Sequence, residues 1–121
     1  MKIEVLDTLF SVCKVESYDR VSPDTPFCFT GHTDEERSLV CPSDAVPDNA
    51  IARDDGWRAF RICGVLDFSL IGILSKISTV LADADIGIFA ISTYNTDYVL
   101  VKGEKLAAAI DALADAGYEL T

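Results

Sequence analysis

Two hydrophobic periods alternate along the second half of the chain. From Ser69 to Ala84, apolar residues recur at intervals of four, three and four positions, which places them on one face of a helix. A second helix is predicted from Glu104 to Ala116, and Gly117 suits its C-terminal cap. Short runs typical of strands cover residues 57–62, 88–93, 97–102 and 118–120. The predicted order is β-α-β-β-α-β, a split βαβ or ferredoxin-like unit.

The first half is rich in strand patterns and poor in helix patterns. Residues 17–26 hold two prolines and small polar residues, which favour a loop. Residues 42–47 have room for one short helical turn, and residues 53–56 form a polar break. The predicted strands are residues 2–6, 9–15, 27–30, 37–41 and 49–52.

The two halves resemble each other. Residues 27–46 overlay residues 88–107 without a gap when they are shifted by 61 positions, so that strand, turn and strand coincide. The shifts of the flanking strands differ from this by about one helix and by about two helical turns. We interpret the first half as a worn copy of the second, with one helix nearly lost and the other shortened. The predicted domains are a degenerate N-terminal unit over residues 1–56 and a complete unit over residues 57–121.

The predicted fold class is therefore α+β. It consists of two tandem ferredoxin-like βαββαβ units, the first degenerate, with antiparallel sheets that carry their helices on one face. A sheet in so small a unit has a second face or an edge that must be covered. We therefore expect a homodimer.

Charge and composition limit the possible partners. Half of the residues are hydrophobic, which supports a folded globular chain, and 20 Asp and Glu against 10 Lys and Arg give a net charge of −10. Such a chain repels phosphate backbones, so we expect no nucleic-acid partner. The N-terminal stretch has no long apolar region, and no apolar run is long enough to span a membrane. We expect a cytoplasmic protein with no membrane partner.

The cysteines do not have metal-ligand spacing. Cys13, Cys28, Cys41 and Cys63 contain no CxxC pair, and the chain has one histidine, His32. We expect buried free thiols, and a disulfide or a reactive thiol is the alternative. No metal or cofactor is expected.

One loop and one hairpin carry a family resemblance. The segment GVLDFSLIGIL, followed by IFAISTYNTDYVLVK, resembles an ACT domain, and together with SLVCPSDAVP and GWRAFRI it is similar to the tandem ACT proteins of the CASTOR-like group. The resemblance implies an amino-acid-binding regulatory module, not an enzyme, with its ligand at an interface between two ACT units. The ligand-binding residues it implies are Gly64, Val65, Leu66, Asp67, Phe68, Ser69, Ile91, Ser92 and Thr93.

Elementary chemistry agrees with that site. The free N–H groups at the start of the Ser69 helix, with its positive dipole end, suit an α-carboxylate. A carboxylate such as Asp67 suits an α-ammonium group. For Asp67 and Ser69 the alternative role is to cap the helix, and for Phe68 it is to pack against the core.

The sequence leaves three functional hypotheses. The leading one is a regulatory protein that senses an amino acid or related metabolite and signals to an unknown protein partner. The alternative is a non-catalytic oligomerisation or interaction module that has lost its small-molecule site. The third, an enzyme that uses a cysteine, has little support, because the chain has no P-loop, GxGxxG or HExxH motif and no acid–base pair of obvious function.

Overall fold

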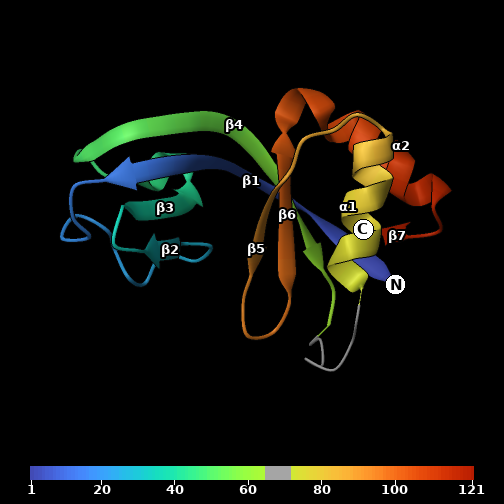
Figure 1. Ribbon diagram of the computed structural model, residues 1–121, viewed down its shortest axis with the longest axis horizontal. Helices are drawn as coiled ribbons and strands as arrows, with labels where there is room; N and C mark the ends of the chain where they lie inside the picture. The colour runs from blue at the N-terminus through green and yellow to red at the C-terminus, as the bar shows by residue number, and fades with distance from the viewer. Residues whose placement is uncertain (65–71) are drawn as a thin grey trace. The chain divides into compact units, whose positions relative to one another are not determined.

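The structure is a computed structural model that describes residues 1–64 and 72–121 (Figure 1). In chain order its elements are β1 (Lys2–Val15), β2 (Phe29–His32), β3 (Arg37–Pro42), the 3-10 helix η1 (Ser43–Ala45), β4 (Ala50–Ile62), α1 (Ile73–Asp83), β5 (Phe89–Ser92), β6 (Asp97–Lys102), the 3-10 helix η2 (Gly103–Lys105), α2 (Leu106–Asp115) and β7 (Glu119–Leu120). The α+β class predicted from the sequence is confirmed.

The chain forms two compact units. The N-terminal unit is Thr8–Trp57, and the C-terminal unit combines Arg58–Thr121 with Met1–Asp7. The main boundary lies one residue from the predicted division between residues 56 and 57, but the first seven residues belong to the C-terminal unit. That the two units are a degenerate and a complete copy of one domain stays a prediction.

The C-terminal unit is a sheet with two helices on one face. Its strand order is β5-β6-β4-β1-β7. Helices α1 and α2 contact each other (Figure 1) and share one core with the strands. Fully buried members of this core are Ile3, Phe60, Ile62, Ile77, Leu81, Val99, Val101, Ala109 and Leu113. The described apolar side chains of both helices therefore face the sheet, as the helical spacing from Ser69 to Ala84 indicated for the first one.

The beginning of β1 adds a fifth strand to the four that the predicted β-α-β-β-α-β order contains. The beginning of β1 lies between β4 and β7, and it pairs in parallel with β7 through Lys2 and Glu119. Ala59 and Leu100, which alternate along β4 and β6 with residues of this core, are also buried. The second face of the sheet, which was expected to need a partner, is therefore not exposed at these two positions.

Two predicted interruptions are absent. β1 continues through residues 7 and 8, which separate the two strands predicted over residues 2–6 and 9–15. β4 continues through Arg53-Asp54-Asp55-Gly56, which were predicted to form a polar break. These side chains are exposed, whereas the strand backbone is paired with β1. Pairing along a long partner strand thus overrides the low strand propensity of Asp and Gly. Gly56 has a positive φ of 84°, which a larger residue would adopt only with strain.

The two hairpins match at a shift of 60 residues, not at the predicted shift of 61. In the N-terminal unit Phe29 pairs with Val40 and His32 with Arg37; in the C-terminal unit Phe89 pairs with Leu100 and Ser92 with Asp97. A slip of one position would turn every side chain to the opposite face of the sheet. The matched turns are therefore residues 33–36 and 93–96.

Both predicted helices exist with shorter bounds. α2 and η2 together fall within one residue of the predicted Glu104–Ala116, and Gly117 has the positive φ expected after a helix end. α1 ends one residue before the predicted Ala84. It begins at Ile73, four residues after the predicted Ser69, because Gly72 has a left-handed backbone with a φ of 80°.

Candidate functional site

A polar cavity lies in the C-terminal unit where β4 ends. Its volume is about 310 Å³, within the range typical of small-molecule sites. The described residues that line it are Glu4, Arg61, Ile62, Cys63, Gly64, Asn95, Thr96 and Tyr98. They come from the beginning of β1, the end of β4 and the hairpin of β5 and β6.

Two opposite charges face each other in this cavity. The Arg61 guanidinium donates from Nε and Nη2 to Oε1 of Glu4, at 3.2 and 2.7 Å. The hydrogen bond to Glu4, and then one with Tyr98, raises the pKa of Arg61, although burial acts in the opposite direction. Both side chains are about one third exposed, so a ligand from solution can reach them.

The hairpin turn is held against β4 at the cavity. The buried Thr96 hydroxyl donates to the Ile62 carbonyl at 2.8 Å, and the Thr93 amide donates to the Thr96 carbonyl at 2.9 Å. Gly64 follows the end of β4 with a φ of 89°, a left-handed backbone that glycine adopts without strain. These constraints place the Gly64 backbone and the turn at one cavity wall.

Among the sequence-predicted site residues that the structure describes, Gly64 alone lies in this lining. Val65, Leu66, Asp67, Phe68 and Ser69 lie outside the described residues. Ile91 is half-buried in β5, whereas Ser92 and Thr93 are exposed at its end. Their hydroxyls make local hydrogen bonds, Ser92 to Asp97 at 2.6 Å and Thr93 to the Thr96 carbonyl at 3.0 Å.

No motif or spacing in the sequence points to Glu4, Arg61, Asn95 or Tyr98. Glu4 and Arg61 are 57 positions apart and meet because β1 and β4 are antiparallel neighbours. The sequence gives no signal for that pairing. Each of the two strands carries one such charge, and only the register of β1 against β4 shows that the two charges are neighbours.

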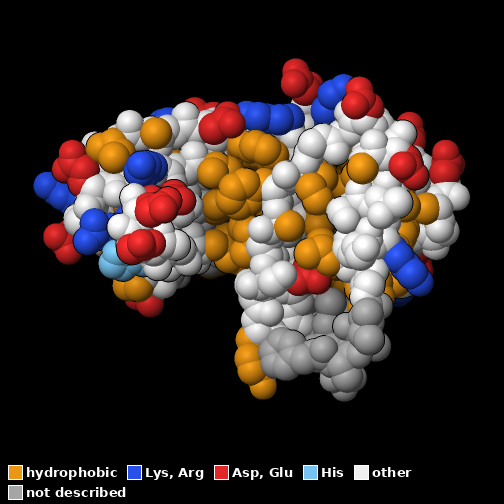
Figure 2. All heavy atoms as spheres, viewed as in Figure 1, with side chains coloured by type: hydrophobic (Ala, Val, Ile, Leu, Met, Phe, Trp, Pro, Cys, Tyr) orange, Lys and Arg blue, Asp and Glu red, His pale blue; other side chains and the backbone are white. Residues whose placement is uncertain are grey.

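Other described residues provide neither a disulfide nor a metal site. All four cysteines are free, with Cys13 and Cys41 buried and Cys28 and Cys63 half-buried. Within residues 1–64 and 72–121, no group of three or more His, Cys, Asp or Glu could hold a metal ion. No helix in this described part is long and apolar enough to cross a membrane. Acidic side chains are spread over the face seen in Figure 2, interspersed with single Lys and Arg side chains.

The family follows from a comparison of the sequence with known domains. A family model described as "ACT domain" matches residues 52–115, more than half of the chain. The chain belongs to the ACT domain family. The resemblance seen in the sequence is thereby confirmed, and the match covers most of β4, both helices and the β5–β6 hairpin.

Relatives of this ACT domain protein include a named sensor. The human protein "Cytosolic arginine sensor for mTORC1 subunit 1" is 36% identical over 81 residues, which cover 66% of this chain and 24% of that protein. Its rat counterpart is 35% identical over the same length. The chain thus spans about a quarter of the length of these curated relatives.

Solved structures share the fold along the whole chain. A protein from Agrobacterium tumefaciens is 30% identical, with a TM-score of 0.88 over 99% of this chain and 91% of that one. The ligand-free regulatory subunit of aspartate kinase from Thermus thermophilus covers 97% of both chains with a TM-score of 0.69. At 11% identity, the second likeness shows the fold alone.

Proposed function

We propose that this ACT domain protein is a non-catalytic regulatory module that binds an amino acid in the cavity at the end of β4. The observation that carries the proposal is the pair of opposite charges, Arg61 and Glu4, in a cavity next to Gly64. Support comes from the family and from relatives that are named as a cytosolic arginine sensor. On the same ground we propose a cytosolic location.

The cavity charges match those of an amino acid. An α-carboxylate accepts hydrogen bonds from the Arg61 guanidinium, whose planar donors suit a carboxylate. An α-ammonium group, or a basic side chain, donates to the Glu4 carboxylate. In the free protein the two side chains satisfy each other, so the ligand exchanges one ion pair for two. The loop Gly64–Ser69 and the strand end Ile91–Thr93 stay predicted contacts.

A regulatory role needs a change that a partner can detect. Binding shifts a population only when the ligand has different affinities for two arrangements of the protein. We propose that these arrangements differ in how two copies of the chain associate, and that an unknown protein partner detects the difference. Light scattering with and without ligand tests the homodimer, and a strict monomer in both conditions rejects it.

The binding test is a thermal-shift screen against the standard amino acids. Binding to the folded state raises Tm by an amount that grows with ligand concentration. We expect at least one amino acid to raise Tm at millimolar concentration, with loss of the shift in Arg61→Gln and Glu4→Gln. The matched control is Arg20→Gln, which breaks the exposed 3.7 Å pair of Arg20 with Asp48 and should leave the shift intact.

Two results reject the proposal in different ways. If no amino acid raises Tm, the alternative of an interaction module without a small-molecule site is favoured. If the shift survives in both Arg61→Gln and Glu4→Gln, the protein binds an amino acid elsewhere. A double variant, Asp67→Ala with Ser69→Ala, then tests the predicted loop.

A further inference from the structure

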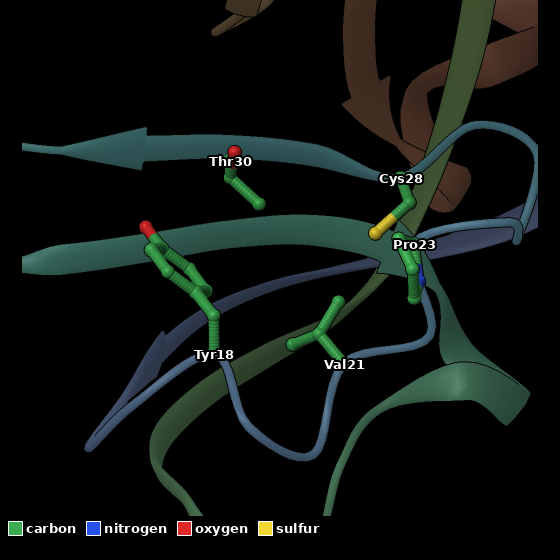
Figure 3. Close-up of a pocket in the computed structure, with 5 residues that line it drawn as sticks. All are labelled: Tyr18, Val21, Pro23, Cys28 and Thr30. Atoms are coloured by element: carbon green, nitrogen blue, oxygen red, sulfur yellow. The ribbon is translucent and has the colours of Figure 1, made fainter.

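The N-terminal unit has a cavity of its own. It measures about 410 Å³ and is lined by Tyr18, Val21, Pro23, Cys28 and Thr30 (Figure 3). In Figure 3 these side chains extend from the β1–β2 connection and from β2 toward a common space. The size is typical of small-molecule sites. Nothing in the proposed function uses this cavity.

The cavity arises where the N-terminal unit has no helix. The connection between β1 and β2 is residues 16–28, thirteen residues, whereas the matched connection between β4 and β5 is residues 63–88, twenty-six residues that contain α1. In the C-terminal unit, α1 fills this place in the fold with Ile77 and Leu81. The shorter connection covers its sheet with half-buried side chains of a loop, and it leaves a space beside them.

The cavity walls are fixed by specific contacts. The Tyr18 hydroxyl donates to the Ser38 carbonyl at 2.9 Å, which ties the loop to β3, and the Val21 amide donates to the Tyr18 carbonyl at 3.1 Å. Next to Cys28, Phe27 has a positive φ of 60°. Its ring packs edge-on against the ring of Phe10, with 6.1 Å between the two ring centroids. A bulky residue in the left-handed region is strained, and such strain clusters at functional sites.

The chemistry of the lining differs from that of the C-terminal cavity. None of the five described lining residues is charged. The Tyr18 ring, Val21 and Pro23 offer apolar surface, and the Thr30 hydroxyl offers one donor and two acceptor positions. We propose that this cavity is a second ligand site, specific for a small neutral molecule with an apolar body and one hydrogen-bonding group.

Each cavity contains one half-buried cysteine, and this provides the test. Cys28 lines the N-terminal cavity and Cys63 the C-terminal one, whereas Cys13 and Cys41 are buried. Indole serves as the probe, because it is neutral, apolar and carries one N–H donor. The full chain is labelled with N-ethylmaleimide at about pH 8.5, since burial raises the pKa of the Cys28 thiol and slows its reaction. Mass spectrometry follows each cysteine separately.

The expected result is selective protection of Cys28. Its labelling rate should fall about fourfold at an indole concentration three times Kd, while the rate of Cys63 is unchanged. An amino acid that binds in the C-terminal cavity should do the opposite. The two proposals can therefore fail independently.

Variants make the assignment specific. Val21→Phe fills the cavity and Thr30→Val removes its hydroxyl, so both should weaken the indole protection of Cys28. The matched control Val80→Phe enlarges a half-buried side chain of α1 and should leave that protection intact. Far-UV circular dichroism checks that each variant folds.

The proposal is overturned if indole at about 10 mM, ten times a weak Kd of about 1 mM, leaves Cys28 labelling unchanged. It is also overturned if Cys63 is protected equally, or if raising the protein concentration alone protects Cys28, which would assign the cavity to a second copy of the chain.

Discussion

The β2–β3 and β5–β6 hairpins are built alike and covered differently. Their registers match pair by pair at a shift of 60 residues, and in each turn a threonine amide donates to a carbonyl three residues later at 2.9 Å. Helices α1 and α2 cover the second hairpin, whereas a loop and the short η1 lie with the first. Register and turn are local properties that do not depend on a covering helix, because strand pairing and turn residues specify them.

The cores show what a covering helix changes. Three consecutive residues of each inner strand are buried, Leu39-Val40-Cys41 in β3 and Val99-Leu100-Val101 in β6. The C-terminal core adds large aliphatic side chains from two helices, but the N-terminal core adds thiols and half-buried loop residues. Loops pack less completely than an amphipathic helix, and the difference leaves the N-terminal cavity.

The largest expected effect comes from removing helix packing in the C-terminal unit. Leu81 is fully buried in α1, so Leu81→Ala should lower the free energy of unfolding by about 3 kcal/mol through lost burial and a residual cavity. Hydrogen exchange should show faster exchange of the β5–β6 amides, while the β2–β3 amides keep their protection. Urea denaturation measures the total loss.

A surface substitution in the same helix is the control for this comparison. Lys76 is exposed, so Lys76→Ala should change stability by less than about 0.5 kcal/mol. If Leu81→Ala accelerates amide exchange equally in both hairpins, the two units unfold together. The difference between a helix and a loop over the hairpin would then not change their local stability.

A smaller effect is expected at the fourth position of the turns. Thr96 is buried and donates to the Ile62 carbonyl, whereas its counterpart Glu36 is exposed. Thr96→Val should cost about 1 to 2 kcal/mol, because it leaves a buried carbonyl without its partner. Glu36→Val should cost less than about 0.5 kcal/mol. Chemical denaturation of the two variants compares them directly, and equal losses would show that the turn itself, not its link to β4, needs a polar residue.

The fold could be predicted from the sequence wherever a pattern is local. Helix α2 and strand β6 fall where the sequence pattern placed them. The polar segment 53–56 was misjudged, because its strand structure depends on a partner strand about forty positions earlier in the chain. The one-residue error in the repeat has a similar cause. Both shifts align apolar residues, and only the cross-strand pairs distinguish 60 from 61.

The candidate site was harder to predict than the fold. Gly64 could be found, because a glycine after a strand and before a helix marks a tight backbone position. Glu4 and Arg61 could not, since their chemistry exists only after β1 lies beside β4. No sequence pattern indicated the N-terminal cavity, because the cavity is the space that the β1–β2 connection leaves unfilled.

The smallest expected effect distinguishes the two inner strands by their chemistry. Burial raises the pKa of the Cys41 thiol from an ordinary 9.0 to about 12. The folded chain therefore holds this proton when the unfolded chain has released it, and the stability it contributes is complete below pH 9 and lost as the pH rises toward 12. Between pH 8 and pH 10 the loss should be about 1 kcal/mol.

At the matched position β6 has Val101, which does not titrate. Cys41→Val should therefore reduce the alkaline loss measured by urea denaturation at each pH, and Val101→Cys should increase it. If neither substitution changes the pH dependence, the Cys41 thiol is solvated, and the N-terminal core is more open than the C-terminal one.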